Sequence, residues 1–208
     1  MTSPFRPNAL RHTLSEIREK ADAFRAHHWP SGSIPVDIDL IVEQIGIYLE
    51  PIAGLKRACD TVACLSPDMT TISVDQETMM DQHQAFFFRF SLAHEVGHLI
   101  LHGRFFESQR SRKVSTIREW VTYVQECSQS AFPAWFEQDA DEFAGRLLVP
   151  RGHLKEALDK ALSAHQNDDL CGFPPDVVRE CLAKEIHRVF EVNAPVIAIR
   201  LRKEKLYP

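Results

Sequence analysis

The sequence predicts an α+β fold with a small sheet, one long helix after it and further helices toward the carboxyl end. Two β-rich runs, DTVACLS and TTISVDQ, are separated by Pro67 and Asp68, a pattern typical of paired strands. The apolar run over about residues 85–102 then has helical length and contains the pentad HEVGH. After residue 133, apolar residues recur at helical spacing, and prolines stand at the expected helix starts.

The segments before the two β-rich runs are expected to be mostly helical. Residues 8–26 place apolar side chains at helical intervals, which predicts an amphipathic helix with this stripe: Leu10, Leu14, Ile17, Ala21 and Phe24. A second helix is predicted over about 37–45, where Gly46 ends it, and a short strand follows over 47–50. The β-rich runs then form a hairpin whose second strand ends near Asp75, so the sheet is small and either mixed or antiparallel.

The long helix is predicted to stop at Gly103. The stretch 104–134 is polar and poorly periodic, apart from a short helical pattern around IREWVTYVQE, and we interpret it as an insertion or loop that serves as a lid or docks a partner. Helices are again predicted in AWFEQDADEFAGRLLVP and in three later segments. The expected organisation is an N-terminal helix in 1–34, a core over 35–150, and a helical region over 151–208 that packs on the core.

The composition argues against several classes of protein. With 208 residues, 44% of them hydrophobic, the chain can bury a substantial core. The formal net charge of −5 argues against direct nucleic-acid binding, because phosphate contacts require clustered Lys and Arg. No apolar run approaches the roughly 20 residues of a membrane span, and the N-terminal stretch is too charged for a secretory signal, so we expect a cytoplasmic protein.

The pentad HEVGH has the spacing of a metal site. On a helix, residues four apart lie on one face, so His94 and His98 can direct ring nitrogens at one ion. Glu95 is turned by about 100° from His94 and reaches the space beside the ion, where a metal-activated water needs a base. Gly97 leaves the adjacent surface without a side chain, so another backbone can approach closely.

A third ligand should come from another element, because catalytic zinc usually takes three protein ligands and one water. In the helix predicted over 135–148, Glu137 lies at the edge of the apolar stripe and Asp141 follows one turn later. This pair suits a ligand and a carboxylate that orients a ligating histidine. Asp139 and Glu142 project away from that edge. Taken alone, the pair also fits an exposed acidic first turn that favours the helix dipole.

Other residues near the pentad have two interpretations each. His102 lies one further turn along, too far to join the same ion easily, so it supports a ligand or lies on the surface. The run Phe86–Phe90 is expected in the core, or else in a substrate-pocket wall. The strand TTISVD is either an edge strand that a substrate extends or an ordinary member of the sheet. Tyr123 and His153 are candidate oxyanion donors, but a surface position is favoured for both.

Two motifs resemble the ImmA/IrrE family of zinc metallopeptidases. RFSLAHEVGHLILH is followed by EQDADEFAGRLLVP, which is similar to that family's HExxH helix and its downstream E-x-x-A-[DN]-x-F-A-x-x-L-L-x-P helix. The resemblance implies that His94, His98 and Glu137 are metal ligands and Glu95 the general base. It also implies a gluzincin-like fold and, as in several members, action on a helix-turn-helix repressor. The stretch between the motifs is long for the family, and no fused helix-turn-helix domain is evident.

These observations predict a zinc-dependent endopeptidase of narrow specificity that cleaves or inactivates a separate regulatory protein. Zn²⁺ is the expected ion, with Mn²⁺ as another divalent candidate. The alternative is a regulatory module that binds metal without proteolysis, as a toxin–antitoxin or stress-response component, and sequesters a partner.

Overall fold

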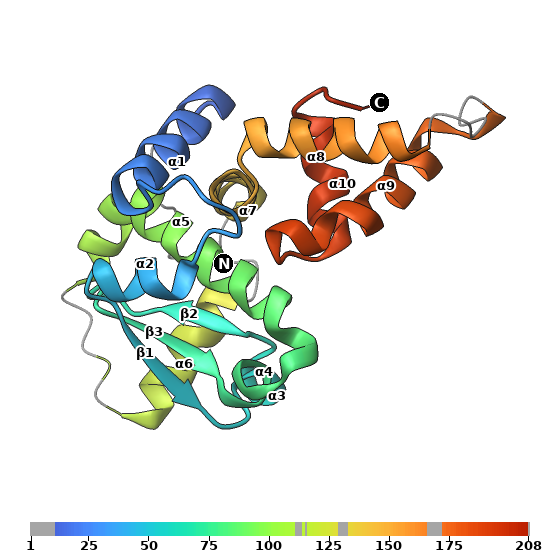
Figure 1. Cartoon of the computed structure of the whole chain (residues 1–208). Coiled ribbons are helices and arrows are strands. Elements are labelled where there is room, and N and C mark those ends of the chain that lie inside the picture. The colour runs from blue at the N-terminus through green and yellow to red at the C-terminus, as the bar shows by residue number, and fades with distance from the viewer. Residues whose placement is uncertain (1–10, 111–113, 115, 129–132, 166–171, 208) are drawn as a thin grey trace.

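The computed structural model describes residues 11–207 except 111–113, 115, 129–132 and 166–171, and it has an α+β fold dominated by helices (Figure 1). The helices are α1 (Leu14–His28), α2 (Ile38–Gln44), α3 (Leu55–Cys59), α4 (Gln76–Met80), α5 (Ala85–Gln109), α6 (Ile117–Ser128), α7 (Ala134–Leu148), α8 (Arg151–Ala164), α9 (Pro175–Phe190) and α10 (Ala194–Lys203). The strands are β1 (Tyr48–Ile52), β2 (Ala63–Leu65) and β3 (Thr71–Asp75). None of the helices in the described ranges is long and apolar enough to cross a membrane.

The predicted N-terminal helix begins later than its apolar pattern. Thr13 caps α1, because its side chain accepts from the backbone of Glu16 while the Glu16 carboxylate accepts from the backbone of Thr13. This reciprocal capping box fixes the start at Leu14. The earlier part of the pattern, residues 8–10, lies outside the described residues.

The sheet is mixed, with the strand order β1-β3-β2. β1 pairs parallel with β3, and β2 pairs antiparallel with it, so the predicted hairpin is confirmed. The edge-strand interpretation of TTISVD is wrong, because β3 is flanked on both sides. β2 is the edge strand nearer the pentad helix, and it contacts α5 (Figure 1).

The predicted stop of α5 at Gly103 is also wrong, because the helix continues to Gln109. A glycine within a helix costs about 1 kcal/mol relative to alanine. Burial of Phe105 and Phe106 in the next turn offsets that cost, since each is at most 6% exposed. Residues 104–109, the first part of the stretch 104–134 that the sequence suggests is an insertion or loop, therefore belong to α5.

A separate helix, α6, occupies much of the remaining insertion. Tyr123 and Val124 of α6 pack in a small apolar cluster with Leu55, Cys59 and Cys64, apart from the main core. The short helical pattern seen around IREWVTYVQE is thus a full helix, and it lies against α3. Residues 111–113, 115 and 129–132 of this stretch lie outside the described residues.

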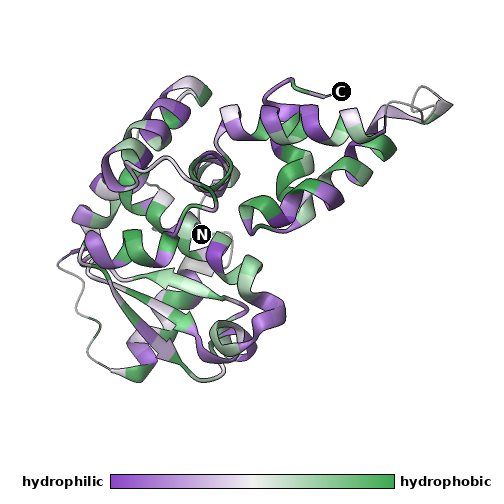
Figure 2. Ribbon diagram, in the orientation of Figure 1, coloured by the Kyte–Doolittle hydropathy of each residue, from purple (hydrophilic) through white to green (hydrophobic). Residues whose placement is uncertain are grey.

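Helix α7 is the centre of the main core. It packs against α5 and α1 and also contacts α10, and Phe143, Leu147 and Leu148 are fully buried. Figure 2 shows hydrophobic colour on α7 and on the facing sides of the C-terminal helices, with hydrophilic residues on outer surfaces. The helix that carries Glu137 is therefore held on several sides.

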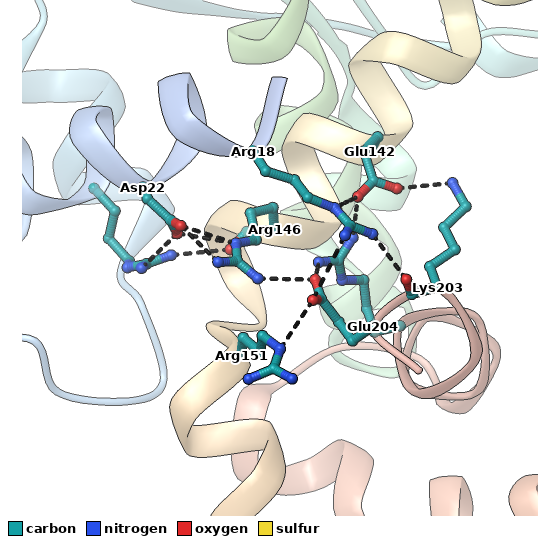
Figure 3. Close-up of polar contacts among 9 residues, drawn as sticks. Arg18, Asp22, Glu142, Arg146, Arg151, Lys203 and Glu204 are labelled. Atoms are coloured by element: carbon teal, nitrogen blue, oxygen red, sulfur yellow. Dashed lines mark hydrogen bonds and ion pairs between the residues drawn. The ribbon is translucent and has the colours of Figure 1, made fainter. Parts of the chain in front are cut away.

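A network of ion pairs with a buried centre joins α1, α7 and α10 and reaches Arg151 at the start of α8 (Figure 3). Arg200, 2% exposed, donates to Glu142 at 2.6 Å and also to Glu204. Arg146 donates to Glu204 at 2.8 Å and to Asp22 at 2.6 Å, so it links these two carboxylates. Arg18, Arg25, Arg151 and Lys203 complete the network. These contacts hold Glu142 away from the edge of α7 that carries Glu137, as the sequence predicts.

Candidate metal centre

The close crossing of α5 and α7 depends on Gly97. A Cβ atom built at Gly97 would lie 3.0 Å from the backbone oxygen of Ala140 and 3.1 Å from its Cα. The sequence predicts a close backbone approach at Gly97, and the structure identifies the approaching segment as α7. The crossing brings the pentad of α5 opposite the acidic edge of α7.

Three side chains converge at this crossing. His94 Nε2 lies 3.1 Å from Glu137 Oε2, and His98 Nε2 lies 3.0 Å from His94 Nε2 and 3.4 Å from Glu137 Oε2. Zinc bonds of about 2.1 Å in tetrahedral geometry would place such donors about 3.4 Å apart, close to the observed separations. His94, His98 and Glu137 therefore form a group that can hold a metal ion.

Asp141 orients the first of these histidines. His94 Nδ1 lies 2.9 Å from Asp141 Oδ1, on the opposite side of the ring from Glu137. Burial alone would lower the pKa of His94, but hydrogen bonds to Asp141 and Glu137 outweigh it and raise the pKa to about 10. In the same cluster, burial raises the pKa of Glu137, but its bonds to the two histidines lower it far more. The sequence predicts Asp141 as this orienting carboxylate, and its place in the structure fits that role.

His102 is buried, which excludes its surface interpretation. The residue is 1% exposed, and its Nδ1 lies 3.0 Å from Nδ1 of His98. Burial, together with the neighbouring His98, lowers the pKa of His102 to about 2, so its ring is neutral. The Nδ1 atom of His98 therefore faces a histidine, His102, whereas the Nδ1 atom of His94 faces the carboxylate of Asp141.

Glu95 points toward the sheet rather than joining the three ligand candidates. Its Oε2 accepts a hydrogen bond of 2.8 Å from the backbone N–H of Leu65 in β2. Burial raises the pKa of the Glu95 carboxyl, although the nearby His98 and His94 oppose that rise. A carboxylate with a raised pKa is a better proton acceptor for a general base than an ordinary one.

A cleft of about 420 Å³ exposes the group to solvent. One wall is β2 with the residues before it, and the opposite wall is α5, from which Phe87 and Phe90 line the cleft. Phe88 instead lies in the core. Both interpretations of the aromatic run therefore hold in part, because some of its rings line the cleft and another is in the core. The rings of Phe87 and Phe90 therefore lie in the same cleft as the three ligand candidates.

The free edge of β2 is partly occupied by the chain's own side chains. Ser66 N–H donates to Thr71 O in β3, so by strand alternation the backbone groups of Leu65 face away from β3. Glu95 accepts from the Leu65 N–H, and the Tyr123 hydroxyl donates to the Leu65 C=O at 2.6 Å. The surface position favoured for Tyr123 is wrong, since it is 4% exposed.

The remaining candidates lie outside the cleft. His153 lines a separate pocket between α1 and α8, with Trp29 and Arg151. Asp139 is nearly buried on another face of α7, where burial raises its pKa. Sequence reasoning missed Leu65 as a partner of Glu95, because only the pairing of β2 with β3 reveals which of its backbone groups face α5.

The comparisons with known proteins do not assign a family. No protein-family model matches the chain, and no curated protein matches it. The fold and the geometry therefore define the class of site: a candidate centre of two histidines and one glutamate for a divalent metal, open to a cleft.

Proposed function

We propose that this chain is a zinc-dependent endopeptidase of narrow specificity that acts on a regulatory protein. The observation that carries the proposal is the position of Glu95. It follows one ligand candidate directly in sequence, its carboxyl pKa is raised, and it lines the same cleft as all three ligand candidates. A base that takes a proton from a water at the metal has to lie in that same cleft.

Two histidine nitrogens and one carboxylate oxygen are a donor set that fits zinc, and each residue of the site has a separate role. Bound zinc supplies an activated water and polarises the scissile carbonyl. His94, His98 and Glu137 would hold the ion, and Asp141 would orient His94. Glu95 would take the proton from the water and deliver it to the leaving amine. The Leu65 N–H, which now donates to Glu95, keeps that carboxylate at the wall of the cleft.

The expected substrate class follows from the resemblance of two motifs to the ImmA/IrrE family. Under that resemblance the fold is gluzincin-like, and the target is a separate cytoplasmic regulator of the helix-turn-helix type. The geometry supports a protein substrate, because β2 forms a wall of the cleft and could align an extended segment of a target.

The test is to replace Glu95 by Gln and to measure metal content and cleavage separately. Zinc-loaded wild-type protein and E95Q are incubated with the product of the neighbouring gene, with and without a chelator, and the fragments are identified by mass spectrometry. We expect E95Q to keep its zinc and to lose cleavage by at least about 100-fold. E107Q, an exposed change on the same helix, is the matched control. Cleavage by zinc-loaded E95Q at the wild-type rate would refute the mechanism.

One observation favours the alternative, a metal-binding regulatory module without proteolysis. Both outward backbone groups of Leu65 are engaged by Glu95 and Tyr123, so this part of the β2 edge has partners within the chain. Such a module would sequester its partner through a metal-stabilised surface. It predicts that E95Q retains full regulatory function while His94→Ala loses it, and that no fragments of the partner appear.

A further inference from the structure

The two histidines of the candidate centre are held by different partners. His94 turns its Nδ1 to the exposed carboxylate of Asp141, whereas His98 turns its Nδ1 to the buried ring of His102. Ligating histidines usually donate their second N–H to a carboxylate, a backbone carbonyl or water. A histidine ring as the partner of His98 Nδ1 therefore calls for an explanation.

The geometry defines which nitrogens carry protons when a metal is bound. His98 Nε2 faces His94 Nε2 and Glu137 Oε2, so Nε2 is the nitrogen that faces the metal and must have a free lone pair. The proton of neutral His98 is then on Nδ1, which lies 3.0 Å from His102 Nδ1. For a hydrogen bond to form there, His102 must accept at Nδ1 and carry its own proton on Nε2.

The surroundings of His102 hold its ring in one orientation. Phe136 stacks on it with centroids 3.7 Å apart and an angle of 17°, and the same phenyl ring stacks on His98 at 4.8 Å and 29°. His102 Nε2 is buried without a hydrogen-bond partner among the described residues. Leaving a buried polar atom unpaired costs about 1–3 kcal/mol, so a phenylalanine would serve better if the position needed only an aromatic ring.

We infer that His102 is a positioning residue for the metal centre: its Nδ1 accepts the Nδ1 proton of His98 and thereby presents His98 Nε2 to the ion. Phe136, which directly precedes Glu137, locks both rings from the opposite helix. The role concerns metal retention, so it does not depend on peptidase activity and can be tested without a substrate.

Two variants separate the hydrogen bond from the packing. His102→Phe keeps an aromatic ring against Phe136 but removes the acceptor, while His102→Asn has an oxygen near the position of Nδ1 but a smaller volume. Zinc affinity is measured by competition with a chromophoric chelator, with circular dichroism as a check on folding. We expect H102F to bind zinc about 10–100-fold more weakly and H102N to stay within about threefold of wild type. Wild-type affinity in H102F would overturn the inference.

If both variants bind zinc weakly or fold poorly, the tautomers of His98 and His102 in the wild-type protein still test the inference. Long-range ¹H–¹⁵N correlation spectra of the zinc-loaded wild-type protein, labelled at histidine, distinguish protonated from unprotonated ring nitrogens. We expect a protonated Nδ1 on His98 and an unprotonated Nδ1 with a protonated Nε2 on His102. A His102 protonated at Nδ1 would overturn the inference, whatever the two variants show.

Discussion

Gly97 sets the distance between the two helices that carry the ligand candidates. Its missing side chain lets the backbone of Ala140 approach to van der Waals contact, and Glu137 lies just one turn before Ala140 on that helix. Side-chain volume at this one position thus controls the geometry of the site, although Gly97 supplies no ligand atom.

Replacing Gly97 by alanine is expected to damage both stability and metal binding. The new methyl group would meet backbone atoms that cannot rotate away, so α7 must shift relative to α5. Overpacking of this kind costs about 1–3 kcal/mol, and the shift separates Glu137 from the two histidines. Chemical denaturation and zinc competition measure the two effects.

Gly103→Ala on the same helix is the matched control. A Cβ atom there would meet nothing within 4 Å, and the residue lies inside α5. We expect this variant to gain up to about 1 kcal/mol from helix propensity and to bind zinc as wild type does. Equal destabilisation of the two alanine variants would contradict the packing role of Gly97.

At the scale of elements, the ion-pair network attaches α1 and α10 to α7, the helix that carries the ligand candidate Glu137. Burial alone would raise the pKa of Glu142, but Arg200, Lys203 and Arg18 outweigh it and lower the pKa to about 2. The folded pKa is below the ordinary value of 4.5, so the carboxylate form stabilises the fold. This contribution is present above about pH 4.5 and disappears as the pH falls toward 2.

Glu142→Gln is therefore expected to destabilise the protein most at neutral pH. The change removes one of the two carboxylate partners of the buried Arg200 and leaves only Glu204, which costs about 1.5–3 kcal/mol. The difference from wild type should shrink as the pH falls from about 4.5 to 2, because wild-type Glu142 becomes protonated in that range. Urea denaturation at a series of pH values measures it, with the exposed Glu156→Gln as control. A difference independent of pH would contradict the assigned pKa shift.

At the scale of the whole molecule, the candidate centre joins two helices whose contacts extend through the core. Helix α5 also contacts β2 and α2, while α7 contacts α1 and α10. An ion held by His94, His98 and Glu137 would clamp these two groups of elements together. Metal binding should therefore raise the free energy of unfolding of the whole molecule.

Zinc is expected to raise the melting temperature of the wild-type protein. A ligand that binds only the folded state at 1,000 times its Kd adds about 4 kcal/mol to the free energy of unfolding. Differential scanning calorimetry with and without zinc measures the shift, and an excess of chelator should reverse it. His98→Ala should show little or no shift. An equal shift in that variant would place the stabilising ion elsewhere.

Sequence patterns predicted the local features of the site well. The spacing of His94 and His98 determines their shared face, and the edge of the apolar stripe on α7 places Glu137 and Asp141 together, since both follow from the helical repeat. The hairpin and the C-terminal helices were also predictable, because turn residues and helix-start prolines act within a few residues of the chain.

Contacts between distant segments were decided by the tertiary structure alone. Because β1 pairs with β3, the segment TTISVD is the central strand of the sheet. Because Phe105 and Phe106 are buried, α5 continues beyond Gly103. The α5–α7 crossing brought Phe136 onto His98 and His102, and the sheet brought Leu65 to Glu95. The sequence by itself determined which residues can bind a metal, because helical spacing is local. Only the fold decided which neighbours orient those residues, because these neighbours are joined by packing and not by proximity in the chain.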